Sequence, residues 1–169
     1  GLRVTGAESG GLVADGTRRE AGREIRERAQ RSTGISEDEI MKIAVKSMGL
    51  DDLKPFDPKE KVVEFMMEDP AETAARERLV RMTCKGFALE TASESPAPGG
   101  GSISAYMGAL GAALGTMVAN LSSHKAGWDD RWEFFSDWAD NGMAVMNELL
   151  YLVDEDTAAF NKIMDVFGM

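Results

Sequence analysis

The sequence predicts a mainly α-helical protein, and three observations carry this prediction. Residues 95–123 contain no charged side chain and, beyond a triple glycine, run for about five helical turns without a proline. Helix-start signals recur at three places before residue 70. In residues 142–167, large apolar side chains recur at helical spacing. Only residues 1–13, with apolar residues around a glycine-rich turn, suggest a strand end and a loop.

Composition restricts the classes of partner. The chain has 169 residues, a formal net charge of -10 and a pI near 4.6, which oppose binding to nucleic acid or to an anionic membrane surface. Its single cysteine, Cys84, excludes an internal disulfide and fits a reducing compartment. We therefore predict a cytoplasmic protein that binds neither nucleic acid nor membrane. Because it begins with Gly1 and stops at Met169 within a helical pattern, we expect an internal piece of a longer protein.

The first two predicted helices differ in character. Residues 17–31 alternate arginine with glutamate, and Ile25 is their only large apolar residue. This pattern predicts a solvated helix with Glu/Arg pairs and little apolar surface for docking. Residues 36–48 begin with a capping box led by Ser36 and end before Gly49, which predicts a helix with one apolar side.

A linker with two prolines, residues 50–58, follows the second helix. Asp57 precedes a proline and predicts the start of a third helix that ends near Glu68. Asp69 precedes another proline and predicts a further helix to about Thr91. Because the two start signals break the chain here, we place a domain boundary in this region.

Residues 95–123 form the stretch around which the rest of the chain is organised. At helical spacing, one side carries large residues and another side carries small ones. A helix that is apolar all round is a buried helix, and the small side would let another backbone approach closely. The run is near the length of a membrane span, but its polar residues and the acidic chain oppose that interpretation. The large residues are Ile103, Met107, Leu110, Leu114, Met117 and Leu121, and the small ones are Ser104, Gly108, Gly111, Gly115 and Ala119.

The triple glycine Gly99, Gly100 and Gly101 is the first candidate site. It would leave free N–H groups at a helix N-terminus, where anions bind. A glycine turn with a purely structural role is the alternative.

Past the central stretch lie His124, Lys125 and an aromatic segment, residues 127–141. Aromatic residues on one helical face are typical of a core or a subunit interface. A lone histidine without clustered cysteines or acids does not predict a metal site. Lys125 is a candidate for pairing with a substrate carboxylate, and a solvated lysine at a helix end is the alternative.

The last segment contains the most informative single residue, Asp156. At 100° per residue it falls in the middle of an apolar helical face. A carboxylate placed there must be paired, hydrogen-bonded or protonated, because stranding it costs several kcal/mol. Such a group suits general acid or base work, whereas an acid that only stabilises the fold is the alternative. The apolar residues of this face are Leu149, Val153, Phe160, Ile163 and Phe167.

Five stretches of the chain carry a resemblance to known enzymes. SPAPGGGSISAYMGALGAALGTMVANLS and LVDEDTAAFNKIMDVFG resemble the N-terminal half of the cyclodeaminase/cyclohydrolase family of folate enzymes. VTGAESGGLV, RSTGISEDEIMKIAVKSMGL and FDPKEKVVEFM resemble the end of a glutamate formiminotransferase domain and its linker. Their order matches the bifunctional formiminotransferase-cyclodeaminases of histidine degradation. The glycine run and the VDED signature at this separation are more specific together than either is alone.

The resemblance implies three parts. Residues 1–31 would be a short α/β remnant of a formiminotransferase domain, residues 32–70 a helical linker, and residues 71–169 an incomplete helical bundle of the cyclodeaminase type. The remnant lacks the segment with the family's catalytic histidine, so we expect no transferase activity from it. The arginine-rich residues 17–31 replace a more apolar helix, which leaves the docking of residues 1–31 open.

The resemblance also implies a reaction and its residues. The expected activity closes formimidoyltetrahydrofolate to methenyltetrahydrofolate with release of ammonia, in an enzyme that forms dimers or larger homo-oligomers. The tetrahydrofolate derivative, with its glutamate tail, would be the substrate, and no tightly bound cofactor or metal is expected. The second acid of the family's V-D-x-D motif falls on Asp156, which would transfer the proton. The expected substrate-binding residues are Pro98, Gly99, Gly100, Gly101, Ser102 and Lys125.

Two other functions stay open at this point. The first is a methenyltetrahydrofolate cyclohydrolase, which shares the fold, although the formiminotransferase-like residues favour the cyclodeaminase. The second is a helical assembly module without chemistry of its own, in which an apolar residue could replace Asp156.

Overall fold

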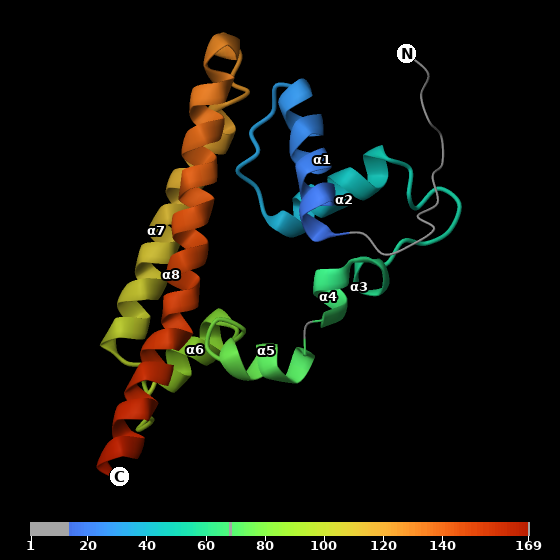
Figure 1. Ribbon diagram of the computed structural model, residues 1–169. Helices are drawn as coiled ribbons and strands as arrows, with labels where there is room; N and C mark the ends of the chain where they lie inside the picture. The colour runs from blue at the N-terminus through green and yellow to red at the C-terminus, as the bar shows by residue number, and fades with distance from the viewer. Residues whose placement is uncertain (1–13, 68, 169) are drawn as a thin grey trace. The chain divides into compact units, whose positions relative to one another are not determined.

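The computed structural model describes residues 14–67 and 69–168 (Figure 1). Most of these residues are helical, and they contain no β-strand, which confirms the prediction of a mainly α-helical chain. The predicted strand end and loop of residues 1–13 lie outside the described residues, so an α/β remnant is not shown.

The chain divides into two compact units. The first unit comprises Gly1–Glu68 and Thr116–Asn141, and the second comprises Asp69–Gly115 and Gly142–Met169. Both units contain parts of the two long helices, α7 and α8. The predicted division into three parts stays a prediction.

In the first unit, helices α1 (Asp15–Arg28) and α2 (Glu37–Ser47) lie where the sequence predicts them. The Ser36 hydroxyl accepts a hydrogen bond from the N–H of Glu39 at 3.3 Å, as expected of a helix N-cap. Gly49 follows the helix with a φ of 65°, a left-handed conformation that favours glycine. Both predicted ends of α2 are therefore confirmed.

Helix α1 docks on α2 although it has little apolar surface. A Cβ atom added at Gly22 would lie 2.5 Å from the carbonyl oxygen of Ile40, so the two helices meet at a glycine. Arg18 is buried, and its guanidinium lies 4.4 Å from the ring centroid of Phe56. Close backbone contact and an arginine–aromatic contact thus replace the missing apolar face.

The predicted third helix is two short helices, α3 (Pro58–Lys61) and α4 (Val63–Met67). Asp57 caps α3 by accepting a hydrogen bond from the N–H of Lys59 at 2.9 Å, as predicted. Val62 breaks the helix because it has an extended conformation, with φ −104° and ψ 122°. This conformation accompanies the burial of the Val62 side chain, which is fully buried in a cluster with Met41 and Val45 of α2.

A short segment after α1 is held in place by polar contacts. The N–H of Thr33 donates to the Ser136 hydroxyl at 3.0 Å, and the Thr33 hydroxyl donates to the Asp140 carboxylate. The Asn120 amide donates to the carbonyl of Gly34 at 2.6 Å. All of these residues belong to the first unit, so this segment is fixed to the parts of α7 and α8 within that unit.

In the second unit, the predicted helix from Asp69 to Thr91 is wrong. Its start is confirmed, because the Asp69 carboxylate accepts a hydrogen bond from the N–H of Ala71 at 2.8 Å. However, α5 (Pro70–Arg76) ends early, and α6 (Cys84–Thr91) begins anew. Two contacts explain the break.

First, the backbone N–H groups of Leu79 and Val80 donate to the carboxylate of Asp154, at 2.7 and 3.1 Å. Second, the Thr83 hydroxyl accepts from the N–H of Gly86 at 3.0 Å and caps α6. Leu79 is thereby buried with Phe87 and Val153 in the core of the unit.

Helices α7 (Gly100–Ser122) and α8 (Trp132–Phe167) are the two long elements. A short 3₁₀ helix, Asp129–Arg131, precedes α8. The two predicted segments at residues 127–141 and 142–167 are largely one helix, because α8 continues without a break past Gly142.

The prediction that α7 is buried on all sides is wrong for the part of the chain that the structure describes. Met107 is 67% exposed and Leu114 is 61% exposed, as are other members of the large stripe. The buried positions instead carry small side chains: in the second unit Ser102 and Ala109, and in the first unit Thr116 and Ala119. By length and composition alone α7 could cross a membrane, a test that core helices of soluble proteins also pass; the absence of a membrane partner stays a prediction.

We expect Gly22→Ala to destabilise the first unit by about 1–3 kcal/mol, because its Cβ has no room against α2. Gly16→Ala is the matched control on the same helix, since nothing lies within 4 Å of its added Cβ. Alanine there should leave the free energy of unfolding unchanged or raise it by up to about 1 kcal/mol. Urea unfolding measures both, and equal effects of the two changes would contradict the docking of α1 through Gly22.

Candidate functional site

The structure brings the glycine run and Asp156 together within the second unit. The N–H of Ser102 donates to Oδ2 of Asp156 at 2.9 Å, and the Ser102 hydroxyl lies 3.1 Å from the same oxygen. These residues are 54 positions apart in the sequence. Because Ser102 is the third residue of α7, the carboxylate engages an N–H that the helix itself leaves unpaired.

Gly101 is required at this contact because of space. An added Cβ would meet Oδ1 of Asp156 first and would lie 2.5 Å from its Cγ and 2.7 Å from its Oδ2, so the carboxylate would have to move. Gly99 is less restricted, with Oδ2 of Asp156 at 4.0 Å from an added Cβ, and nothing lies within 4 Å at Gly100. The three glycines therefore differ in how much space a side chain would have.

The remaining predicted residue of this segment, Pro98, follows a cis peptide bond with Ala97. The N–H groups of Gly100 and Gly101 have no hydrogen-bond partner among the residues that the structure describes. The N–H and hydroxyl of Ser102, by contrast, are engaged by Asp156. Substrate binding by Pro98, the glycines and Ser102 stays a prediction.

The surroundings of Asp156 differ from the sequence-based expectation. Val153 is buried on this face of α8, but Phe160 and Ile163 are 40% and 54% exposed, and Asp156 itself is exposed. Asp156 is therefore an exposed residue whose carboxylate is hydrogen-bonded through Oδ2, rather than a carboxylate surrounded by apolar side chains. Helical periodicity identified the face of α8 on which Asp156 lies. It could not show that only part of this face packs against other residues.

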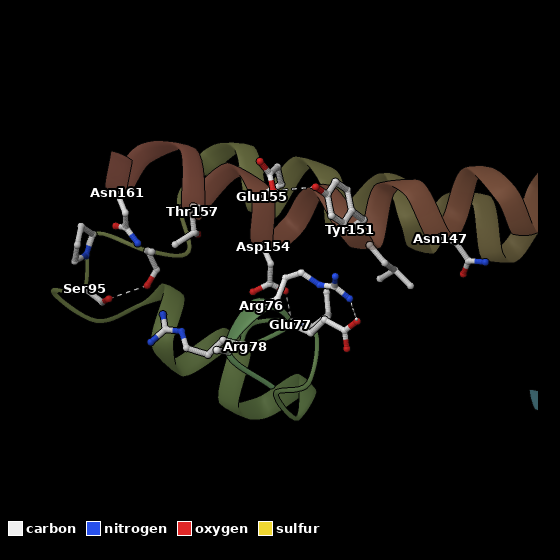
Figure 2. Close-up of a pocket in the computed structure, with 16 residues that line it drawn as sticks. Arg76, Glu77, Arg78, Ser95, Asn147, Tyr151, Asp154, Glu155, Thr157 and Asn161 are labelled. Atoms are coloured by element: carbon white, nitrogen blue, oxygen red, sulfur yellow. Dashed lines mark hydrogen bonds and ion pairs between the residues drawn. The ribbon is translucent and has the colours of Figure 1, made fainter. Parts of the chain in front are cut away.

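A groove runs along the neighbouring face of α8, with a volume of about 780 Å³ (Figure 2). Arg76 and Arg78 lie on one wall, and Tyr151 and Thr157 of α8 lie on the other. The hydroxyl of Tyr151 donates to Glu155 at 3.0 Å, and this hydrogen bond raises the pKa of Tyr151 above its ordinary value.

Thr157 connects this groove with the site. Its hydroxyl lies 3.4 Å from that of Ser102, while Asp156 does not line the groove. The lining carries both signs of charge, since Glu77, Asp154 and Glu155 accompany the two arginines. The groove is therefore a neighbour of the Ser102–Asp156 contact and not its continuation.

Lys125 lies in the other unit of the chain. It belongs to the first unit, where its ammonium group lies 4.3 Å from the ring centroid of Trp128. His124, in the same unit, shares a 2.8 Å hydrogen bond with the Ser123 hydroxyl. In the described part of the chain, no three histidine, cysteine or acidic side chains converge as a metal site would require. The predicted role of Lys125 in substrate binding stays a prediction.

Comparison with known proteins divides the chain into two matched regions. The family model described as "Formiminotransferase-cyclodeaminase" matches residues 83–169, which include Ser102 and Asp156. The model described as "Formiminotransferase domain" matches residues 1–68.

Curated relatives match over most of the chain. The mouse (Mus musculus) formimidoyltransferase-cyclodeaminase is 34% identical over 135 residues, which are 80% of this chain and 24% of the relative. The chicken (Gallus gallus) protein of that name is 32% identical with the same coverage. A methenyltetrahydrofolate cyclohydrolase from Methylorubrum extorquens is 31% identical over 87 residues, 52% of this chain and 42% of that protein. The chain thus spans about a quarter of the length of the first two relatives.

We expect Gly101→Ala to displace Asp156 and to break its hydrogen bond with the N–H of Ser102. Loss of a hydrogen bond to a charged group should speed exchange of that amide hydrogen by about tenfold or more. Gly100→Ala is the matched control, because its Cβ meets nothing within 4 Å. Hydrogen exchange followed by NMR measures both, and unchanged protection of the Ser102 amide in Gly101→Ala would contradict the contact.

Asp154 should be important for stability, because its carboxylate holds two backbone N–H groups of the segment between α5 and α6. We expect Asp154→Asn to lower the free energy of unfolding by about 1–3 kcal/mol. Asp165→Asn removes an exposed acid of the same helix and should change it by less than about 0.5 kcal/mol. Chemical denaturation distinguishes the two, and an Asp154→Asn protein as stable as the control would be evidence against this structural role.

Proposed function

Because the chain belongs to the formiminotransferase-cyclodeaminase family, we propose that it carries the proton-transferring part of a formimidoyltetrahydrofolate cyclodeaminase. In this proposal the chain is part of a bifunctional enzyme of histidine degradation, whose other domain is the glutamate formimidoyltransferase. Asp156 is the catalytic residue, and the substrate is a tetrahydrofolate that bears a formimidoyl group on N5.

The proposed reaction requires the transfer of one proton from N10 of the folate to the leaving nitrogen. N10 of the folate attacks the formimidoyl carbon, so that an N10–C bond forms and the C=N double bond becomes a single bond. The C–N bond to the former imino nitrogen then breaks, and ammonia leaves. Overall, when the formimidoyl group reacts as its amidinium ion (C=NH2+), the hydrogen of N10 is removed, one proton is added to the leaving nitrogen, and the products are ammonia and the methenyl cation. A single carboxylate can take the first proton and give it to the departing amine.

One observation supports Asp156 in this role above all: its carboxylate is anchored through one oxygen, while the other oxygen lies against Gly101 and accepts no hydrogen bond from the described part of the chain. Oδ2 is engaged by Ser102. Oδ1 has no hydrogen-bond partner among residues 14–67 and 69–168, and the side chain is exposed. A proton carrier needs this combination, because it must be held in position and still reach the substrate.

A matched region favours the cyclodeaminase over the cyclohydrolase. Residues 1–68 match a formiminotransferase domain, which would supply the formimidoylated folate that a cyclodeaminase consumes. The similarity to a methenyltetrahydrofolate cyclohydrolase makes hydrolysis the second candidate. In that reaction, Asp156 would take a proton from the water that attacks the methenyl carbon.

We expect Asp156→Asn to lower the kcat of ammonia release from formimidoyltetrahydrofolate by roughly 10²–10⁴-fold, the usual contribution of a general acid or base. Folate binding should persist, because the amide keeps the size of the side chain. Asp165→Asn, another exposed acid on α8, should retain the original kcat. Ammonia release is measured for the 169-residue chain and for the complete enzyme that contains it.

Each outcome selects one function. Loss of ammonia release in Asp156→Asn alone supports the cyclodeaminase, and full activity of this variant excludes Asp156 as the catalytic residue. If the unchanged enzyme releases no ammonia but hydrolyses methenyltetrahydrofolate, the cyclohydrolase replaces it. Failure of the complete enzyme in both assays would leave a helical assembly module.

A further inference from the structure

We propose that Ser102 is a positioning residue that selects which oxygen of Asp156 carries the proton; this inference rests on the proposed function. Ser102 is fully buried, and both its N–H and its hydroxyl lie within hydrogen-bond distance of Oδ2. An oxygen that already accepts from two donors has less capacity for a further proton. The substrate's proton therefore goes to Oδ1.

Besides the Thr157 hydroxyl at 3.4 Å, the hydroxyl of Ser102 has two nearer acceptors for its one hydrogen. It lies 2.8 Å from the carbonyl oxygen of Val153 and 3.1 Å from Oδ2 of Asp156. A serine hydroxyl can donate only one full hydrogen bond at a time. The two acceptors therefore compete for this hydrogen, and the charge on Asp156 decides between them.

While Asp156 is a carboxylate, Oδ2 is the stronger acceptor, because hydrogen bonds to charged oxygens are the stronger ones. Once Oδ1 holds a proton, Oδ2 is part of a neutral acid, and the carbonyl of Val153 becomes the better acceptor. The hydroxyl can turn from one acceptor to the other while both helices stay in place. Ser102 thereby accommodates Asp156 before and after it takes up the proton.

The carboxyl group is restricted on a second side as well. The backbone of Gly101 lies so close to it that an added Cβ would meet Cγ at 2.5 Å. The hydrogen bonds of Ser102 hold Oδ2, and Gly101 blocks displacement toward α7. Proton transfer requires the carrier oxygen within hydrogen-bond distance of the reacting nitrogens, so this restraint should increase kcat rather than substrate affinity.

The test uses three substitutions in the complete enzyme, with formimidoyltetrahydrofolate as substrate. Ser102→Ala should lower kcat roughly tenfold or more while KM stays within about twofold, because a hydrogen bond to a charged group is lost. Ser102→Thr keeps the hydroxyl and should restore most of kcat. Ser102→Cys has nearly the size of serine but is a weak donor, so it should resemble Ser102→Ala.

The cysteine variant separates positioning from simple space filling. If Ser102→Cys restores kcat fully, or if Ser102→Ala changes KM instead of kcat, the inference is overturned. Urea unfolding of each variant shows whether it folds; if the threonine variant does not, the comparison of cysteine with alanine decides by itself.

Failure of this inference can be told apart from failure of the proposed function. If Asp156→Asn is inactive while Ser102→Ala keeps the original kcat, the catalytic role of Asp156 stands and the role of Ser102 does not. If Asp156→Asn is fully active, both are overturned.

Discussion

The candidate site depends on one interaction, the hydrogen bonding between Ser102 at the start of α7 and the carboxylate of Asp156 on α8. It satisfies a backbone N–H that every helix leaves unpaired near its start. It also fixes one carboxylate oxygen and leaves the other without a hydrogen bond from the described part of the chain. The absence of a side chain at Gly101 makes the contact possible, because any Cβ there would occupy the space of the carboxylate.

Two neighbouring acids on α8 illustrate how position separates structural from chemical roles. Asp154 and Asp156 are two residues apart, so they point to different sides of the helix. Asp154 uses both of its oxygens to hold the backbone at Leu79 and Val80. Asp156 uses one oxygen and keeps the other free. The first arrangement suits a structural acid, whereas the second suits a group that exchanges protons with a ligand.

The sequence predicted those features that local signals encode. Capping residues located the starts of α2, α3 and α5, and helical periodicity singled out Asp156 without predicting its contact with Ser102. Features set by distant contacts were not predicted. The break between α5 and α6 depends on Asp154, which is 75 residues from Leu79. The exposure of the large residues of α7 was likewise missed, because periodicity identifies an apolar face without showing what covers it.

The role of Asp156 is tested most directly by a crystal structure of the complete enzyme with a tetrahydrofolate bound. We expect N10 of the folate within hydrogen-bond distance of Oδ1 of Asp156, with Oδ2 still held by Ser102. A folate bound away from Asp156 would contradict it. So would a bound state in which Ser102 has released the carboxylate and contacts the folate directly.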